Sequence, residues 1–398
     1  MYNLTDRQIV LGVSGSIAVY KAADLASKLT QAGVRLDVLL TPAAVEFVTP
    51  LTFQSLSGRP AYVDMFDTSS AAAELHIELA RRAEALLIAP ASATTIARVA
   101  LGLAEDMISL TALATRAPII VCPAMDPQMF EHEATQGHLE TLRGRGAHVV
   151  GPEVGRLASG HSGPGRMSEV DTIIGALRYV LGRGGDLGGK TVVVSAGGTQ
   201  EPIDPVRYVG NYSSGKMGYA LAEAARDRGA DVVLVSGPAA LPQPYAVRLL
   251  SVRRAAEMRD AVLAECADAD AVVMAAAVAD YQPAEAVGQK IKRRREGLSL
   301  SLVRTPDILA ELGQREGLVK VGFAAESEEL LANARRKLEE KGLDLIVAND
   351  VTAEGCGFGS DTNKVILLDG QSEEELPLLD KYEVAARVLD RVAALVRR

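Results

Sequence analysis

The sequence has no tryptophan and is poor in cysteine and aromatic residues. Only 4% of its 398 residues are aromatic, and its three cysteines lie far apart, at positions 122, 266 and 356. Neither a disulfide framework nor a Cys-x-x-Cys metal site is therefore indicated. No apolar run approaches the roughly 20 residues that cross a bilayer, and the first residues are polar and charged. We therefore expect a cytoplasmic chain without a membrane segment.

The chain also lacks the excess of positive charge that binding of nucleic acid requires. It carries 42 Lys and Arg against 51 Asp and Glu, which gives a formal net charge of -9. An open face for nucleic acid needs a basic surface, so we expect no nucleic-acid partner. With 48% apolar residues the chain is typical of a globular protein. Its length corresponds to two or three domains of about 150 residues each.

A glycine-rich stretch at residues 181–189 separates two halves of the sequence. Because it has little to bury, we predict a first domain over residues 1–183, a linker over 184–189 and a second domain over 190–398. All five histidines precede this stretch and none follows it. Proton transfer by an imidazole therefore belongs to the first half.

Short apolar runs alternate with helical patterns in both halves. The strands expected in the first half are residues 8–13, 34–40, 85–89, 118–122 and 147–150, with a helix at 17–31. The strands expected in the second half are residues 191–195, 231–236, 271–275, 319–323 and 343–348, with helices at 218–228 and 328–340. Runs that are apolar throughout are typical of strands buried on both faces. The sequence therefore predicts an α/β fold of two doubly wound, Rossmann-like domains with mainly parallel sheets.

Ligands of open parallel sheets bind at the carboxyl ends of the strands. In the first half these ends carry small or hydroxyl-bearing residues, with one isoleucine: Gly15, Ser16, Ile17, Thr41, Ser92 and Thr94. Small residues let a phosphate approach the amino end of a helix, and hydroxyls fit an ordinary helix cap equally well. The first turn lacks the GxGxxG spacing, so a dinucleotide is not indicated. A third strand end adds Met125 and Asp126.

Five motifs in order, SGSIAVYK, LHIELAR, APASATT, CPAMDPQM and SGHSGPGRM, resemble the flavin-dependent cysteine decarboxylase family. The resemblance implies a flavodoxin-like domain that binds FMN and oxidises and decarboxylates a cysteinyl carboxylate. It implies an acid/base role for His76. Without the resemblance, His76 would be interpreted as a histidine near a helix start whose hydrogen bonds are satisfied. It also implies flavin binding by residues 90–95 and by the small strand-end residues, and binding of the substrate carboxylate by Met125 and Asp126.

Two positions depart from that family pattern. Asp126 stands where the family usually has Asn, and Ser159 stands where it usually has Cys. An ionised Asp126 repels a carboxylate unless it is turned away, and a serine hydroxyl is a far poorer acid than a thiol with a pKa near 8.5. We keep both as catalytic residues, with His161 as an alternative proton donor. Ser159 and His161 belong to the glycine-rich segment 159–167, whose composition is typical of a mobile lid over the substrate.

The second half has its own loops at the strand ends. Residues 210–216 nearly form a Walker A motif, but Met217 occupies the Ser/Thr position, so a P-loop ATPase is rejected. What remains is a Gly/Ser loop that opens a helix and that, with Arg207 and Asn211 nearby, suits a phosphate or a carboxylate. At a later strand end, the carboxylate of Asp280 can hold Mg²⁺, a ribose or a base amine.

The ordered motifs GGTQEPIDPVR, NYSSGKMG, AAAVADY, KIK, TPDIL, GFAAE and ANDV look very like phosphopantothenate-cysteine ligase. The resemblance implies that Asn211 and Lys290 are catalytic, that Arg207 handles phosphopantothenate and that Asp280 holds Mg²⁺. It implies contacts to CTP from Met274, Ala275, Ala276, Asp280, Pro306, Asp307, Ile308, Leu309, Phe323, Lys337 and Lys341. The two lysines lie four apart on a helical pattern and so share a face. Pro306 is expected in the first turn of a helix that begins at Thr305.

Together the two resemblances cover nearly all of the chain and imply the bifunctional decarboxylase/ligase family of coenzyme A biosynthesis. The ligase joins 4'-phosphopantothenate to cysteine through an acyl-cytidylate, converting CTP to CMP and pyrophosphate. The decarboxylase then converts 4'-phosphopantothenoylcysteine to 4'-phosphopantetheine with FMN. The family forms homo-oligomers, which implies trimeric flavin domains, dimeric ligase domains and a dodecamer. The alternative is an active ligase fused to a catalytically impaired or regulatory flavin-binding module.

Overall fold

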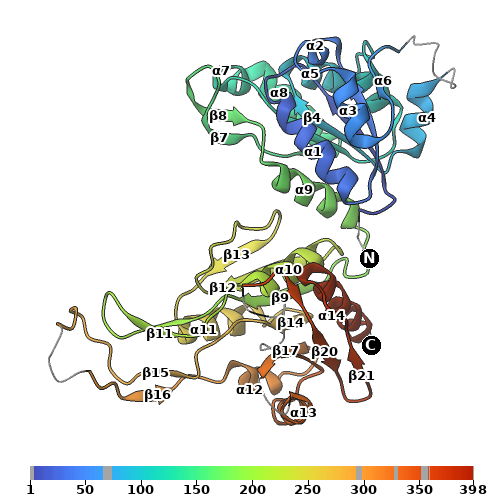
Figure 1. Cartoon of the computed structure of the whole chain (residues 1–398). Helices are drawn as coiled ribbons and strands as arrows, with labels where there is room; N and C mark the ends of the chain where they lie inside the picture. The colour runs from blue at the N-terminus through green and yellow to red at the C-terminus, as the bar shows by residue number, and fades with distance from the viewer. Residues whose placement is uncertain are drawn as a thin grey trace. The chain divides into compact units, whose positions relative to one another are not determined.

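A computed structural model describes residues 4–65, 74–292, 298–326, 330–350, 357 and 359–397. Internal contacts divide the chain into two compact units, residues 2–181 and residues 182–398, which we call the first and the second unit (Figure 1). The predicted α/β fold with two mainly parallel sheets is confirmed. Among the described residues, no helix is long and apolar enough to cross a membrane.

The first unit is built on a six-stranded parallel sheet with the order β3-β2-β1-β4-β5-β6. Its strands are β1 (Gln8–Val13), β2 (Arg35–Leu40), β3 (Ala61–Tyr62), β4 (Ala85–Ala91), β5 (Ile119–Pro123) and β6 (His148–Val149). All seven residues of β4 are buried, as the continuous apolar run predicts for a central strand covered on both faces. The two-residue strand β3 was not predicted, because no apolar run marks it in the sequence.

The helices of the first unit connect the parallel strands of this sheet or follow the last of them. They are α1 (Val19–Gln31), α2 (Pro42–Val45), α3 (Pro50–Ser57), α4 (Leu75–Arg82), α5 (Ala93–Leu101), α6 (Met107–Ala114), α7 (Pro127–Glu131), α8 (Glu133–Gly144) and α9 (Val170–Gly182). Helix α1 buries Val19, Ala22, Leu25, Ala26 and Leu29, which is the helical spacing of one apolar face.

The glycine-rich segment 159–167, which we call the flap, contains one strand of a β-hairpin that packs beside α7 (Figure 1). Strand β7 (Glu153–Arg156) pairs antiparallel with β8 (Ser162–Arg166). A Cβ on Gly165, whose φ is +155°, would lie 2.2 Å from the Met125 carbonyl oxygen, and one on Gly163 would lie 2.9 Å from Pro127 Cγ. These glycines therefore let the hairpin approach the β5–α7 loop closely.

The second unit has an eight-stranded sheet with the order β13-β12-β9-β14-β17-β18-β20-β21, in which the last two strands are antiparallel to their neighbours. Its strands are β9 (Thr191–Ala196), β12 (Asp231–Ser236), β13 (Arg248–Ser251), β14 (Ala271–Met274), β17 (Val319–Glu326), β18 (Leu345–Asp350), β20 (Val365–Leu368) and β21 (Glu373–Glu375). Smaller pairs are β10 (Gln200–Pro202) with β11 (Tyr208–Gly210), β15 (Tyr281–Pro283) with β16 (Leu302–Arg304), and β19 (Thr362–Asn363) with β22 (Leu379–Asp380). Figure 1 shows β11, β15 and β16 extending beyond one end of the large sheet.

Helices cover both faces of this second sheet. They are α10 (Lys216–Arg226), α11 (Ala255–Glu265), α12 (Ile308–Gly313), α13 (Leu330–Glu340) and α14 (Lys381–Val396). Val192 and Val194 of β9 pack in one core cluster with α10 and α14, whereas Val193 packs in another with α11 and α12. Successive strand residues thus point to opposite faces, and both faces are apolar because both are covered.

Two expectations about local structure need correction. Helix α12 begins at Ile308, because the Asp307 carboxylate accepts the Ala310 N–H at 3.1 Å and caps it, so Pro306 precedes the helix instead of lying in its first turn. The stretch at 184–189 was expected to bury little, yet Leu187 is fully buried and Asp186 pairs with the Arg228 guanidinium. Where the two domains divide in detail stays a prediction.

Candidate functional sites

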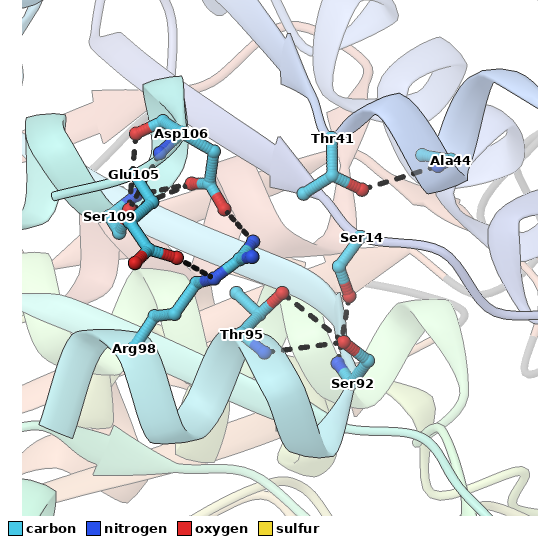
Figure 2. Close-up of polar contacts among 9 residues, drawn as sticks. All are labelled: Ser14, Thr41, Ala44, Ser92, Thr95, Arg98, Glu105, Asp106 and Ser109. Carbon is cyan, nitrogen blue, oxygen red and sulfur yellow. Dashed lines mark hydrogen bonds and ion pairs between the residues drawn. The ribbon is translucent and has the colours of Figure 1, made fainter. Parts of the chain in front are cut away.

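Ser14 joins two strand ends at the carboxyl edge of the first sheet (Figure 2). Its buried hydroxyl donates to the Pro90 carbonyl oxygen at 2.8 Å and accepts the Ser92 N–H at 2.8 Å. Ser92 in turn caps α5, with its Oγ 3.4 Å from the Thr95 N–H. The loops after β1 and β4 are therefore held at a fixed spacing around the sheet edge.

A cavity of about 390 Å³ opens at this edge of the first unit. It is lined by the loop after β1, the start of α5, the β5–α7 loop and the β7–β8 hairpin. Seven of the residues predicted for the flavin and substrate line it: Gly15, Ser16, Ile17, Ser92, Met125, Asp126 and Ser159. The volume lies in the range of small-molecule sites, about 300 to 1,000 Å³.

Three predicted residues of the first unit, and the alternative proton donor His161, do not line this cavity. Thr41 caps α2, accepting the Ala44 N–H at 3.2 Å (Figure 2). Thr94 is exposed on α5, and His76 is half-buried on α4. Within one copy of the unit, the structure therefore does not bring His76 to the cavity formed around Asp126 and Ser159.

The two departures from the family pattern are hydrogen-bonded to each other. Ser159 Oγ donates to Asp126 Oδ2 at 2.9 Å, and His161 Nδ1 lies 3.3 Å from the same oxygen. The other carboxylate oxygen accepts the Gln128 N–H at 3.1 Å. The Ser159 hydroxyl, the Gln128 N–H and His161 together lower the pKa of Asp126, so this carboxylate is ionised at neutral pH. Asp126 is turned toward the hairpin rather than protonated.

The second unit has a larger cavity, of about 880 Å³, at the carboxyl edge of its sheet. Most of the residues predicted for the nucleotide and its activation line it: Asn211, Met274, Ala276, Asp280, Pro306, Asp307, Ile308, Leu309, Phe323, Lys337 and Lys341. They come from five separate segments, which the fold brings together at the ends of β14 and β17, at α12 and at α13. The cavity therefore combines apolar walls with two ammonium groups on one side.

Lys341 forms an ion pair with Asp307, which also caps α12. Burial by itself would raise the pKa of Asp307, but the Lys341 ammonium and the Ala310 N–H outweigh it and lower the pKa. The start of the helix expected at Glu328 lies outside the described residues, and α13 runs from Leu330 to Glu340. Lys337 is on α13 and Lys341 directly follows its last residue, and both line the cavity.

The Asp280 carboxylate is exposed at the mouth of this cavity. The backbone around it is fixed, because the Thr305 N–H donates to the Asp280 carbonyl oxygen at 3.0 Å and the Thr305 hydroxyl bonds the Ala279 carbonyl. No group of three or more His, Cys, Asp or Glu side chains in the described ranges is arranged to hold a metal ion. Any Mg²⁺ here would depend on phosphate oxygens for most of its ligands.

Arg207 and Lys290 lie outside the large cavity. The Arg207 guanidinium binds the buried Asp204 carboxylate and donates to the Ile291 carbonyl oxygen at 3.1 Å. Asp204 also accepts the Ile291 N–H at 3.1 Å, and the Arg207 hydrogen bond holds the pKa of Asp204 far below its usual range. This network anchors the segment next to the exposed Lys290. Of the basic run that follows, residues 293–295 lie outside the described residues.

A smaller cavity of about 120 Å³ adjoins the large one. It is lined by the Ser213-Ser214-Gly215 loop before α10, by Lys216 and Lys381, and by Ala275. The two cavities share Ala276, Ala277 and Phe323 as a common wall. Asn211 lies beside this wall, where its amide donates to the Val278 carbonyl oxygen at 3.0 Å.

Comparisons with known proteins add the family. The profile of the DNA/pantothenate metabolism flavoprotein C-terminal domain matches residues 187–396, and the Flavoprotein profile matches residues 1–182. Over 400 residues the chain is 45% identical to the coenzyme A biosynthesis bifunctional protein CoaBC of Vibrio vulnificus strain CMCP6, covering 100% of both chains. This chain belongs to the CoaBC family.

A second curated relative and one solved structure are also similar to this chain. The CoaBC protein of Bacillus subtilis strain 168 is 44% identical over 401 residues, which cover 99% of this chain and 98% of its own. A crystal structure of the C-terminal domain of a CoaBC protein is 40% identical and covers 53% of this chain and 98% of its own, with a TM-score of 0.46.

In this member of the CoaBC family, three cations at the first cavity were not predicted from the sequence. Lys21, Arg156 and Arg166 line it. Lys21 Nζ donates to Glu169 Oε1 at 2.8 Å and to the Met167 carbonyl, and Arg166 bonds the same Glu169 oxygen at 3.1 Å. Because these residues are scattered along the chain, only the folded hairpin and α1 bring their charges together.

Proposed function

We propose that the second unit joins 4'-phosphopantothenate to cysteine and that the first unit decarboxylates the product, 4'-phosphopantothenoylcysteine, to 4'-phosphopantetheine. The chain is a bifunctional enzyme of coenzyme A biosynthesis, with a flavoprotein decarboxylase half and a ligase half, as in its full-length relatives. One observation carries the proposal: each half, matched by its own profile, has a cavity at the carboxyl edge of its own sheet.

In the first unit the cavity fits FMN. The loop at Gly15, Ser16 and Ile17 leads into α1, where free N–H groups favour a phosphate, and Arg156 and Arg166 add positive charge. Ile17 and Met125 provide apolar surface for a flat ring. The bound flavin would supply a two-electron acceptor that takes a hydride from the substrate and gives it back.

In the second unit the large cavity suits a nucleoside triphosphate, which we assign as CTP. The substrate carboxylate has to attack the α-phosphorus, and we assign Lys337 and Lys341, which line the cavity, to neutralise the leaving pyrophosphate. We assign Asp280 to hold a Mg²⁺ ion, which would supply positive charge against the phosphate oxygens, since one carboxylate plus phosphates is an ordinary Mg²⁺ environment. We assign Lys290, on the anchored segment after β15, as a further cation for the nucleotide phosphates.

The smaller cavity suits the phosphate of 4'-phosphopantothenate. Its Ser213-Ser214-Gly215 loop opens α10, and Lys216 and Lys381 contribute positive charge. The substrate carboxylate would then lie at the wall shared with the nucleotide cavity, next to Asn211. This placement puts the two reacting groups side by side.

The ligase assignment is tested by incubating the chain with 4'-phosphopantothenate, cysteine and Mg²⁺ while CTP and ATP are compared. We expect CMP and pyrophosphate in equal amounts, and a strong preference for CTP. Release of neither nucleotide monophosphate would contradict the ligase role. A homo-oligomer, with trimeric first units, dimeric second units and a dodecamer overall, is part of the proposal and is tested by the mass of the assembly in solution.

The decarboxylase assignment is tested by anaerobic incubation of the flavin-loaded chain with 4'-phosphopantothenoylcysteine. We expect CO₂ and 4'-phosphopantetheine in equal amounts. A chain that binds FMN but releases no CO₂ would instead be a ligase fused to a regulatory flavin module.

A further inference from the structure

Removal of CO₂ from 4'-phosphopantothenoylcysteine requires a proton, and this inference rests on the proposed function. In the net reaction the C–CO₂⁻ bond breaks and a C–H bond forms at the same carbon, so one proton is consumed for each CO₂ released. The hydride that the flavin takes from the substrate is returned, so no other oxidant or reductant is needed. An acid of the protein must therefore deliver the proton near the cavity of the first unit.

Most side chains that line this cavity are unsuited to that task. Arg156 and Arg166 stay charged at any working pH. Lys21 is held by Glu169 and by the Met167 carbonyl. Asp126 is ionised, because three hydrogen-bond partners lower its pKa, and His76 lies on α4, away from these lining residues.

Ser159 is also unsuited, for a geometric reason. Its hydroxyl hydrogen points to Asp126 Oδ2, 2.9 Å away. A hydroxyl that already donates to an anion has no proton to offer elsewhere, and loss of that proton would put two negative charges side by side. The serine therefore does not simply replace the thiol of the family pattern.

Tyr20 also lines the cavity, but a phenol is a far weaker acid than an imidazolium. His161 does not itself line the cavity. Its Nδ1 lies 3.3 Å from Oδ2 of Asp126, which does line it, so the carboxylate holds the ring beside the cavity and favours the Nδ1–H form. The side chain is 65% exposed, so Nε2 can take up a new proton from solvent after each turnover. We propose that His161 delivers the proton to the substrate carbon, with Asp126 and Ser159 as positioning residues that fix the hairpin turn and the imidazole.

The test compares His161→Gln and His161→Asn with the wild type and with His138→Gln, a control on α8 outside the cavity. Flavin-loaded protein is mixed anaerobically with 4'-phosphopantothenoylcysteine, and CO₂, the mass of the product and the flavin colour are recorded. Without the acid, the substrate is still oxidised and loses CO₂, but the hydride is not returned. We expect both variants to release CO₂ in the first turnover, to leave the flavin reduced and to yield a product with two hydrogens fewer. Formation of the saturated product should fall by about 10²-fold or more.

Two further variants separate the roles within the site. Ser159→Ala keeps the contact between Asp126 and His161, so it should lower saturated product less than His161→Gln does. Adding Ser159→Cys to His161→Gln supplies a thiol acid and should restore saturated product. Flavin affinity, measured by fluorescence titration, should be the same for every variant.

Three results would overturn the role of His161. The first is that both His161 variants form saturated product at the wild-type rate, and the second is that both lose flavin binding. The third is that Ser159→Ala lowers the formation of saturated product as much as His161→Gln does, or more. If the wild type itself releases no CO₂, the proposed decarboxylase function fails instead, so the two failures are distinguishable.

Discussion

Both units end their parallel strands in loops that surround a cavity, yet the side chains around the two cavities differ in kind. The first cavity has a hydrogen-bonded cluster of Asp126, Ser159 and His161, which suits the movement of protons. The second has no histidine to draw on and presents Lys337 and Lys341 to its interior. The same architecture thus presents groups suited to acid/base chemistry in one unit and to charge neutralisation in the other.

The difference predicts that each activity can be removed without loss of the other. The largest effect is expected for the double variant Lys337→Ala/Lys341→Ala, which removes both ammonium groups from the second cavity. Because developing charge on the leaving pyrophosphate is no longer balanced, kcat/KM for the nucleotide in ligation should fall by about 10²- to 10³-fold. Arg335→Ala is the control, since Arg335 is on the same helix but pairs with Glu373. Decarboxylation that falls in parallel with ligation would break the comparison.

A second prediction concerns the close contact between the hairpin and the β5–α7 loop. Gly165→Ala places a Cβ 2.2 Å from the Met125 carbonyl oxygen, so the hairpin must shift away from Asp126. We expect decarboxylation to fall by about 10-fold or more, because a displacement of about 1 Å in a catalytic group costs this much or more. Ligation should be unchanged. Gly137→Ala on α8, which meets no neighbouring atom within 4 Å, is the matched control and should keep both activities.

Ser14→Ala is expected to affect stability and flavin affinity of the first unit only. It leaves the Ser92 N–H without its buried partner and leaves the Pro90 carbonyl oxygen with only the Ser14 N–H, 3.2 Å away, which costs about 1 to 3 kcal/mol. Denaturant unfolding followed by flavin release should report this loss while ligation persists. Thr141→Ala, at an exposed site on α8, serves as the control. Equal stability of Ser14→Ala and wild type would show that the strand ends are held in another way.

The smallest effect is expected for Asp307→Asn. Asparagine caps a helix as well as aspartate does, but it no longer neutralises Lys341, so nucleotide affinity should rise by up to about 5-fold, as for a partly exposed ion pair. Since the pKa of Asp307 in the fold lies below its ordinary value of 3.8, the ion pair persists above that pH and is lost only as the pH falls further. Calorimetric titrations should therefore give the same ratio between the nucleotide affinities of Asp307→Asn and the wild type at pH 5.5 and at pH 8. A ratio that changes between them would place the relevant titration elsewhere.

The central strands of both sheets were predictable because their signal is local. Residues 8–13 and 231–236 are apolar runs, and the strands β1 and β12 have these same bounds. The short strands β3, β7 and β8 were not predicted. Strand β3 has only two residues, and β7 and β8 include glycines and polar side chains, so their pairing depends on distant segments. The flap appeared as a flexible segment for the same reason.

The candidate sites were predictable where a residue follows a strand directly, as Ser92 and Asp126 do. They were not predictable where a side chain from elsewhere completes them, as Arg156 and Lys21 do at the first cavity. The motif also did not reveal that Asp126 and Ser159 contact each other, although they are 33 residues apart.

Apolar periodicity and strand-end motifs lie in neighbouring residues, so they were enough to predict the two α/β halves, the family and the edge of each sheet where a cavity lies. Which polar groups face each other, Asp126 with Ser159 and His161 and Asp307 with Lys341, follows from the folded structure alone. Ionisation depends on distances and burial between segments far apart in the chain, and these exist only after folding.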